Sequence, residues 1–300
     1  MSQLEKEIRQ LLARNRDGSY STKAGREDML LQMEQQLKAN GYATKRMHLS
    51  DLGGRHINSL VNSWQNQGLS EGTIKNRMSA LRWLSEKIGN KGLVKPNNKD
   101  YSIANRQYVT NENKAQDLAK LSNVDKSKLS PNVALSVELQ QNFGLRREEA
   151  MKFQPLFALG GHSPATAEKL MIEASWCKGG RYREIPITTP QQRELLQKVL
   201  DFAGSSSMIP NDKSYKQHIN TFERETASAG IGQTHGLRHL YAQNRYYALT
   251  GWQCPAVGGF RQLSKEEKEI DKQARLQISS ELGHGRIQVT SIYLGSWSRG

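Results

Sequence analysis

The segment LGHGRIQVTSIYLGSWSRG, residues 282–300, places a histidine directly after Leu-Gly and a tyrosine nine residues further on. C-terminal segments are usually the part of a chain where order is lost. This one combines the reactive side chains of His284 and Tyr293 with apolar neighbours that favour packing. We therefore expect it to pack against the protein body and to take part in chemistry there.

Three upstream segments carry residues of the same reactive kind: GLRREE (144–149), CKGGRYREIP (177–186) and HGLRH (235–239). His235 and Arg238 are three residues apart at an expected helix start, so their side chains share one face. Arg146 begins another expected helix, and Glu149 follows one turn later, where it can orient or neutralise the arginine. Lys178 lies at the tip of an expected hairpin, from which a flexible cation can reach into a cleft. Two arginines, a lysine and histidines around one phenol describe a site for a phosphodiester.

The chemistry explains why these residue types belong together. Attack on a phosphodiester builds charge on its non-bridging oxygens, which paired guanidinium groups clamp better than the point charge of lysine. A phenol has an ordinary pKa of about 10, so it needs a nearby base, usually histidine, and cations that favour the phenolate. The departing 5′-oxygen needs a proton, which a lysine on a mobile hairpin can give. The sequence shows no carboxylate cluster for magnesium, so we expect protein cations alone to meet the phosphate charge, with no metal and no other cofactor.

Hydrophobic periodicity indicates the fold class. Apolar residues at helical spacing predict helices over 3–14, 27–40, 56–68, 70–89, 132–142, 146–153, 190–203, 214–228, 235–249 and 265–283. Between 169 and 188, two apolar-alternating runs flank KGGR, whose glycines suit a hairpin turn. The chain is therefore expected to be mainly α with a small antiparallel β-sheet in the second of two domains.

Composition excludes several classes of protein. A chain of 300 residues with 36% hydrophobic and 24% charged residues suits a globular protein of two domains. No stretch approaches the roughly 18 apolar residues that span a bilayer, and the N-terminus has the pattern of an amphipathic helix rather than a signal peptide. Two cysteines cannot form a disulfide framework or a cysteine-rich zinc site. We expect a cytoplasmic, nucleoid-associated protein with no membrane partner.

Charge points to a polyanionic partner. Lysine and arginine number 43 against 29 acidic residues, giving a net charge of +14. The excess is spread over the chain, with 18 basic and 10 acidic residues in 1–107 and 25 and 19 in the rest. Such a distribution fits a protein that surrounds nucleic acid, although a basic surface that is merely solvated has the same composition.

Taken singly, each motif also has a structural explanation. His235 and Arg238 can form an ordinary surface pair, Lys178 can be a solvated turn residue, and Tyr293 can simply anchor the terminus in the core. The functional interpretation rests on all of the motifs occurring in a workable order within one domain.

In combination, the motifs resemble those of the tyrosine recombinases, also called phage integrases. GLRREEA matches the family's G-L-R-x-x-E box, and CKGGRYREIPI resembles its β-hairpin lysine segment. THGLRH matches the H-x-L-R-H box, and LGHGRIQVTSIY matches the L-G-H box followed by the T-x-x-Y nucleophile. The catalytic residues that the resemblance implies are Arg146, Lys178, His235, Arg238, His284 and Tyr293.

The resemblance implies a mechanism. Tyr293 attacks a scissile phosphate, forming a 3′-phosphotyrosine and freeing a 5′-hydroxyl. Arg146 and Arg238 hold the non-bridging oxygens, and His284 donates a further hydrogen bond to them. The bond energy stays in the covalent ester, so strand exchange needs neither ATP nor metal.

The remaining two residues move protons. His235 handles the tyrosine proton, and Lys178 protonates the leaving 5′-oxygen. The resemblance further implies a homotetramer on two double-stranded DNA sites that exchanges strands through a Holliday junction, in integration or excision of a mobile element. An accessory DNA-bending or directionality factor is compatible with this scheme.

The resemblance also divides the chain. Residues 1–107 resemble, more loosely, the helical core-DNA-binding (SAM-like) domain, chiefly through LSEGTIKNRMSALRWL; 108–116 are the expected linker, and 117–300 the catalytic tyrosine recombinase domain. The two domains are expected to form a clamp around DNA.

The helix expected at 70–89 is the candidate for the major groove. Lys75 and Arg82 lie seven residues apart on one polar face, with Arg77 nearby. Lysine and arginine on one face of a helix can contact both phosphates and base edges. A solvated helix face has the same pattern.

Two departures from the family pattern concern the C-terminal part. The connection between the H-x-L-R-H and L-G-H boxes is lengthened by residues 254–275, for which the sequence suggests no role. The stub LGSWSRG after Tyr293 is shorter than the helix that many members dock into a neighbouring protomer, so communication between subunits is expected to use another element or this short tail. No room is expected for an arm-binding domain ahead of the first domain.

Two other functions remain open at this point. A type IB topoisomerase-like enzyme would use the same nucleophile to relax supercoiled DNA as a monomer. A non-catalytic DNA-binding regulator on the same scaffold is also conceivable, although the complete set of candidate catalytic residues argues against it. A metal-dependent nuclease is disfavoured because no acidic cluster occurs.

Overall fold

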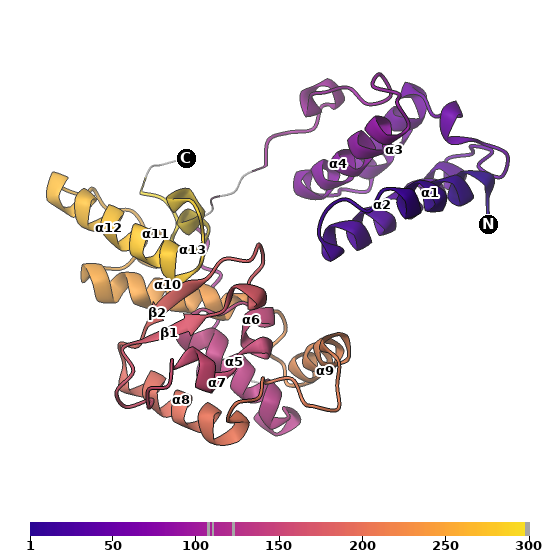
Figure 1. Ribbon diagram of the computed structural model, residues 1–300. Coiled ribbons are helices and arrows are strands. Elements are labelled where there is room, and N and C mark those ends of the chain that lie inside the picture. The colour runs from indigo at the N-terminus through magenta and orange to yellow at the C-terminus, as the bar shows by residue number, and fades with distance from the viewer. Residues whose placement is uncertain (107–108, 110, 122–123, 298–300) are drawn as a thin grey trace. The chain divides into compact units, whose positions relative to one another are not determined.

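The computed structural model describes residues 1–106, 109, 111–121 and 124–297 and divides into two compact units, Met1–Gln107 and Tyr108–Gly300 (Figure 1). The first unit is helical throughout its regular structure. Its elements are α1 (Gln3–Arg14), α2 (Tyr20–Ala39), η1 (Leu49–Asp51), α3 (Gly54–Asn66), α4 (Glu71–Lys87) and η2 (Asn98–Tyr101).

Capping and apolar spacing explain these helices. Ser2, Ser19 and Ser70 each accept a hydrogen bond from a backbone N–H in the first turn of α1, α2 and α4. The sequence prediction of α2 was wrong at its start, because Ser19 caps a helix that begins well before residue 27. The helices bury one core, whose largest members include Leu30, Leu37, Ile57, Leu60, Trp64, Met78 and Leu84.

The second unit places helices around a small sheet. Its helices are η3 (Lys126–Lys128), α5 (Pro131–Phe143), α6 (Arg147–Lys152), α7 (Pro155–Ala158), η4 (Ala174–Trp176), α8 (Pro190–Ala203), α9 (Tyr215–Ser228), α10 (His235–Thr250), α11 (Pro255–Gly258), α12 (Lys265–Glu281), η5 (Ile287–Thr290) and α13 (Ser291–Leu294). Strands β1 (Lys169–Ile172) and β2 (Arg183–Pro186) pair antiparallel, with Leu170 opposite Ile185. The predicted fold class, mainly α with a small antiparallel sheet in the second domain, is confirmed. The clamp around DNA stays a prediction.

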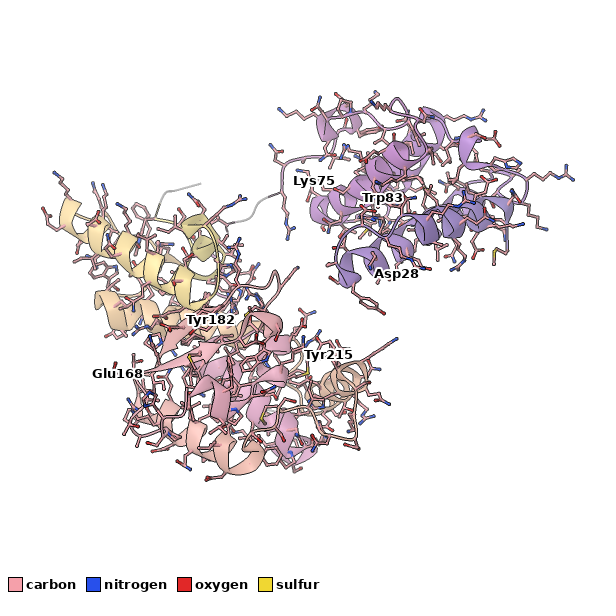
Figure 2. All side chains as sticks on the ribbon, viewed as in Figure 1. Asp28, Lys75, Trp83, Glu168, Tyr182 and Tyr215 are labelled. Atoms are coloured by element: carbon pink, nitrogen blue, oxygen red, sulfur yellow. The ribbon has the colours of Figure 1, made fainter. Side chains whose placement is uncertain are left out.

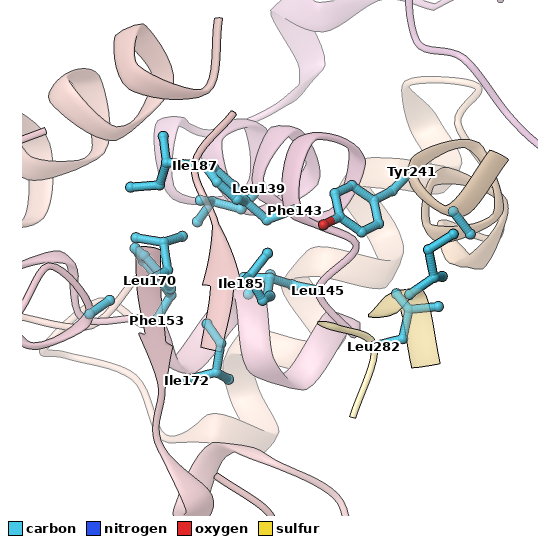
Figure 3. Close-up of a cluster of buried hydrophobic side chains, with 14 of the residues drawn as sticks. Leu139, Phe143, Leu145, Phe153, Leu170, Ile172, Ile185, Ile187, Tyr241 and Leu282 are labelled. Carbon is cyan, nitrogen blue, oxygen red and sulfur yellow. The ribbon is translucent and has the colours of Figure 1, made fainter. Parts of the chain in front are cut away.

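The core of this unit lies between the sheet and α5. Figure 3 shows Leu170, Ile172 and Ile185 of the sheet close to Phe143 and Phe153, and all five are fully buried. Side chains alternate along a strand, so the residues next to these apolar ones in each strand face outward. At Arg183 the alternation instead turns a charged side chain inward, where it is 5% exposed.

The expected linker at 108–116 contacts the second unit over part of its length. Gln116 N donates to Gly236 O at 3.0 Å, and Asn113 Oδ1 accepts from Gln243 Nε2 at 3.0 Å. Residues 107, 108 and 110 lie outside the described residues. The described residues 111–116 are therefore attached to α10 of the second unit.

Candidate active site

Arg238 is the most deeply buried charge of the site. It lies one turn into α10 and is 1% exposed. Its Nη1 donates to the carbonyl of Gly144 and its Nη2 to the carbonyl of Leu282. Burial lowers the pKa of this guanidinium to about 10, which leaves it charged at neutral pH. Two backbone carbonyls thus fix the plane of a buried cation without neutralising it.

The Tyr293 hydroxyl lies directly on this cation. Arg238 Nε donates to it at 3.3 Å, and His284 Nε2 is also 3.3 Å away. Arg238 Nη2 lies 3.4 Å from the same His284 nitrogen. Since a guanidinium only donates hydrogen bonds, His284 Nε2 acts as the acceptor in this arrangement. The LGH box and the T-x-x-Y tyrosine therefore meet at the buried arginine of the H-x-L-R-H box.

A buried carboxylate ties three arginines together. Glu149 is fully buried, and its oxygens lie 2.7 Å from Arg146 Nη1 and 2.7 Å from Arg183 Nη2, with Arg238 Nη1 at 4.0 Å. Burial alone would raise the pKa of this carboxyl, but the arginines, Arg183 first, lower it to about 2. Glu149 therefore stays ionised and holds Arg146 beside Arg238. Residues from three distant motifs converge on one carboxylate.

The surroundings of the two histidines His235 and His284 favour their neutral forms. Desolvation, followed by Arg238 and Arg146, lowers the pKa of His235 and brings that of His284 to about 3. The His235 ring centroid lies 5.9 Å from that of Tyr293, and the side chain is exposed. A pocket of about 610 Å³ beside it is lined by Arg146 and His235 among others. Neutral imidazoles beside a phenol can accept its proton.

In the described part of the chain, no hydrogen bond or ion pair joins Lys178 to this cluster. Gly180 N donates to Cys177 O at 3.0 Å, closing a turn in which Gly179 has φ +84°. That positive φ is what the third position of a type II turn requires, so glycine is needed there. Lys178 at the second position is exposed, and among the described residues no hydrogen bond or ion pair holds its ammonium group. The structure therefore brings five of the six predicted catalytic residues together and leaves the lysine on the hairpin.

Two family models match most of the chain. One described as phage integrase, N-terminal, matches residues 1–94, and one described as integrase matches residues 103–244. The chain belongs to the phage integrase family of tyrosine recombinases. Among curated proteins, none matches this family member in sequence.

Solved integrases share the fold of this family member. The Tn1549 transposon integrase, solved in complex with transposon right-end DNA, is 14% identical, with a TM-score of 0.57 and coverage of 98% of this chain and 94% of its own. A lambda integrase dimer bound to a COC′ core site is 16% identical, with a TM-score of 0.59 and coverage of 98% and 77%. The match extends over both units of the chain.

The three residues expected to contact DNA differ in their surroundings within this integrase. Lys75, labelled in Figure 2, makes no hydrogen bond or ion pair with the described residues. Arg82 Nη2 donates to Asn98 Oδ1 at 2.7 Å, and its Nε donates to Lys95 O at 3.4 Å. Arg77 packs over the Trp64 ring at 5.2 Å, and desolvation lowers its pKa. The DNA-contact role of all three stays a prediction.

Sequence reasoning missed several residues at the integrase site. Arg183 was overlooked although strand alternation signals it, since an arginine takes an inward position next to Ile185. His239, last residue of the H-x-L-R-H box, has its ring centroid 4.7 Å from that of Tyr293, and burial lowers its pKa to about 4. The Arg181 guanidinium lies directly against Gly285, beside His284. No spacing rule connects the hairpin to the L-G-H box, so the sequence offered no signal for Arg181.

The lengthened connection at 254–275 has a structural role in this integrase. Arg275 Nη1 donates to Gly295 O at 3.1 Å, and Trp297 Nε1 donates to Asp271 Oδ1 at 2.9 Å. A Cβ at Gly295 would lie 3.1 Å from Pro255 Cβ. The inserted residues therefore form a seat for the chain that follows Tyr293.

The described residues offer neither a metal-binding cluster nor a membrane-spanning helix. They contain no group of three or more histidine, cysteine, aspartate or glutamate side chains able to hold a metal ion. Within the same residues, no helix is long and apolar enough to cross a membrane. The expectation that the reaction needs no metal stays a prediction.

Proposed function

We propose that this integrase is a site-specific DNA recombinase that cuts and rejoins double-stranded DNA through a 3′-phosphotyrosine at Tyr293. The observation that carries the proposal is the position of the Tyr293 hydroxyl, 3.3 Å from both Arg238 Nε and His284 Nε2. A phenol held by a buried cation and a neutral imidazole is a nucleophile next to groups that can bind an anion.

In the proposed reaction, the phosphate occupies the place that the phenol occupies in the unbound site. Arg146, Arg238 and His284, the last in the tautomer protonated at Nε2, bind the non-bridging oxygens and displace the hydroxyl from Arg238. The displaced phenol lies beside His235, which is neutral and accepts its proton. The phosphorus–O5′ bond breaks as the bond from Tyr293 to phosphorus forms.

Lys178 is the proposed acid for the leaving oxygen. It stands on an exposed turn directly before Gly179 and Gly180, so its ammonium can reach a DNA strand bound over the site. Rejoining reverses the steps, with the 5′-hydroxyl of the partner strand attacking the phosphotyrosine. The ester conserves the bond energy, so the scheme uses no ATP and no metal.

The proposal extends to the assembly. Exchange of strands between two DNA sites requires a protomer for each of four cleavages, hence a homotetramer and a Holliday junction. The related Tn1549 and lambda integrases were solved with DNA, which supports double-stranded DNA as the partner. Integration or excision of a mobile element, in the cytoplasm and with an accessory DNA-bending or directionality factor, is the proposed setting.

The test uses suicide duplexes, nicked next to candidate scissile phosphates, that tile the DNA flanking the gene for this protein. Wild type and Tyr293→Phe are incubated with them in EDTA and resolved on a denaturing gel. We expect a covalent protein–DNA adduct with wild type and none with Tyr293→Phe.

Each other outcome identifies a different function. An adduct that persists in Tyr293→Phe means that another residue is the nucleophile. Tight binding without an adduct indicates a non-catalytic DNA-binding regulator. Relaxation by wild type of supercoiled plasmids that lack the cleaved site indicates a topoisomerase-like activity.

A further inference from the structure

Residues 111–116, which we call the strap, contact α10 at its first turn and at Gln243. Gln116 N donates to Gly236 O at 3.0 Å, between His235 and Leu237. A Cβ at Gly236 would lie only 2.6 Å from Gln116 Cγ, so the strap packs on the bare helix backbone. The strap is thus fitted to the helix that carries the catalytic histidine and arginine.

A single buried amide joins the strap to the nucleophile. Gln243 of α10 is 4% exposed, and its Nε2 donates both to Tyr293 O at 3.2 Å and to Asn113 Oδ1 at 3.0 Å. Asn113 Oδ1 also accepts from Ala115 N at 2.9 Å, which fixes the Asn113 side chain within the strap. Both hydrogens of one amide are therefore divided between the strap and the Tyr293 backbone.

The strap also binds the chain just beyond the nucleophile. Ser296 N donates to Asn111 Oδ1 at 2.9 Å, and Asn111 Nδ2 donates to Ser296 O at 3.2 Å. Gly295 has φ +74°, and a Cβ there would lie 2.6 Å from Asn111 Oδ1. Asn111 therefore packs against Gly295, which has no side chain, and is held there by two hydrogen bonds to the Ser296 backbone.

Tyr293 depends on such contacts because its own helix is very short. Helix α13 has 4 residues, far fewer than a helix needs to be stable by itself. The rate of an attack on phosphorus depends steeply on position, since a misplacement of about 1 Å can cost roughly 100-fold. What holds the Tyr293 backbone therefore controls the chemistry.

We infer that Gln243 and Asn113 are positioning residues for the cleavage step, with the strap setting the place from which Tyr293 attacks. This inference rests on the proposed function, because it assigns them to the reaction of Tyr293. Gln243 aligns the nucleophile with Arg238, which lies five residues earlier on the same helix. Asn113 in turn aligns Gln243, so the strap acts on the tyrosine through Gln243.

The experiment measures single-turnover adduct formation on a cleaved suicide duplex, together with DNA affinity and thermal unfolding of the full chain. We expect Gln243→Ala to slow adduct formation by about 30-fold and Asn113→Ala by about 10-fold, within the range for a misplaced group. DNA affinity and unfolding temperature of the Asn113 variant, whose side chain is exposed, stay at wild-type values. Asn113→Asp keeps the acceptor oxygen and restores most of the rate.

Coupling and a matched control complete the design. Because the two residues act in series, the double variant should be no slower than Gln243→Ala alone. Asn132→Ala removes an asparagine hydrogen bond of the same kind, to Met208 O at 2.9 Å, and leaves the rate unchanged.

Three results overturn the inference. The first is an adduct rate of Asn113→Ala equal to that of Asn132→Ala. The second is a double variant whose loss of rate is the product of the two single losses. The third is a loss of rate in Asn113→Ala that Asn113→Asp shows in full as well. In all three cases the wild-type adduct still supports the proposed function. A wild type that binds the duplex and forms no adduct overturns the proposed function and this inference together.

Discussion

Helices α4 and α10 both carry an arginine that sequence reasoning assigned to DNA, but the two helices hold these arginines in opposite ways. Arg238 of α10 is anchored by the carbonyls of Gly144 and Leu282, and its Nε points to the Tyr293 hydroxyl. Arg82 of α4 is held by Lys95 O and by Asn98 Oδ1 at the start of η2, both in the segment that follows its own helix. An arginine held by hydrogen bonds to carbonyl groups can take part in the reaction when one of its N–H groups still faces the site. When none of them does, it stabilises the fold instead. Charge and spacing alone do not distinguish the two cases.

The largest effect should come from changing the shape of the α10 cation while keeping its charge. Lysine at Arg238 cannot bind two carbonyls and a phosphate oxygen together, because its charge is a point. We expect Arg238→Lys to lower the rate of adduct formation by about 1,000-fold, the loss typical of a transition-state donor. DNA affinity, measured by fluorescence anisotropy, should change much less. A loss below about tenfold would mean that the planar anchoring of Arg238 is not what catalysis uses.

The buried carboxylate beside Arg238 should matter more for stability than any surface pair. Glu149→Gln leaves Arg183 buried without a counter-charge, which should lower the free energy of unfolding by about 3 kcal/mol. Glu148→Gln is the matched control, since the Glu148–Lys152 pair at 2.7 Å is partly exposed and should contribute less than about 1 kcal/mol. Urea denaturation of the full chain, followed through the second unit, measures both. Equal effects would show that the arginine cluster does not need Glu149.

The pH dependence of cleavage tests the histidine roles. Desolvation and two arginines lower the pKa of His235, so its neutral form persists below the ordinary value of about 6.5. The adduct rate should therefore stay level as the pH falls past 6.5 and decline only where His235 takes up a proton. His235→Ala should remove this decline and slow the plateau. A profile that declines through 6.5 in wild type would contradict a lowered His235 pKa.

The smallest effects should appear on α4. Lys75→Ala removes one cation that makes no hydrogen bond or ion pair in the part of the chain that the structure describes, so the slope of log affinity against log salt should fall by about 1. Arg82→Ala should instead lower the unfolding temperature of the first unit, because it removes the bonds to Lys95 and Asn98. If Arg82→Ala reduces the salt slope with unchanged stability, α4 uses its arginine as α10 does, and the contrast disappears.

Much of the architecture could be predicted, because it depends on local signals. Apolar spacing located α1, α4, α8 and α9 to within two residues at each end. The start of α2 was missed because residues 20–26 lack the apolar spacing that marks a helix. The sequence predicted a hairpin with a short glycine turn. In the structure, ten residues that include the short η4 helix separate the two strands.

The candidate site was predictable only where a motif carried it. The boxes located Tyr293, His284, Arg238 and Arg146, and the structure brings these together with His235. The contacts that hold them were not predictable, because Gln243, Asn113 and Arg275 lie outside every box. Gln243 and Arg275 donate to the backbone carbonyls of Tyr293 and Gly295. A hydrogen bond to a carbonyl leaves no pattern in a sequence, whereas a reactive side chain does.

Gly144 has a consequence for how mutational data on this protein should be interpreted. Its φ is +60°, a Cβ there would overlap the Tyr241 ring, and its carbonyl accepts from Arg238. Every substitution would therefore push Tyr241 away or turn the carbonyl that orients the arginine. In a saturation scan scored by recombination, this residue should tolerate as few replacements as the nucleophile itself, although it has no side chain to take part in the reaction. In such a scan, intolerance to substitution would therefore identify residues that position the catalytic side chains as well as the catalytic side chains themselves.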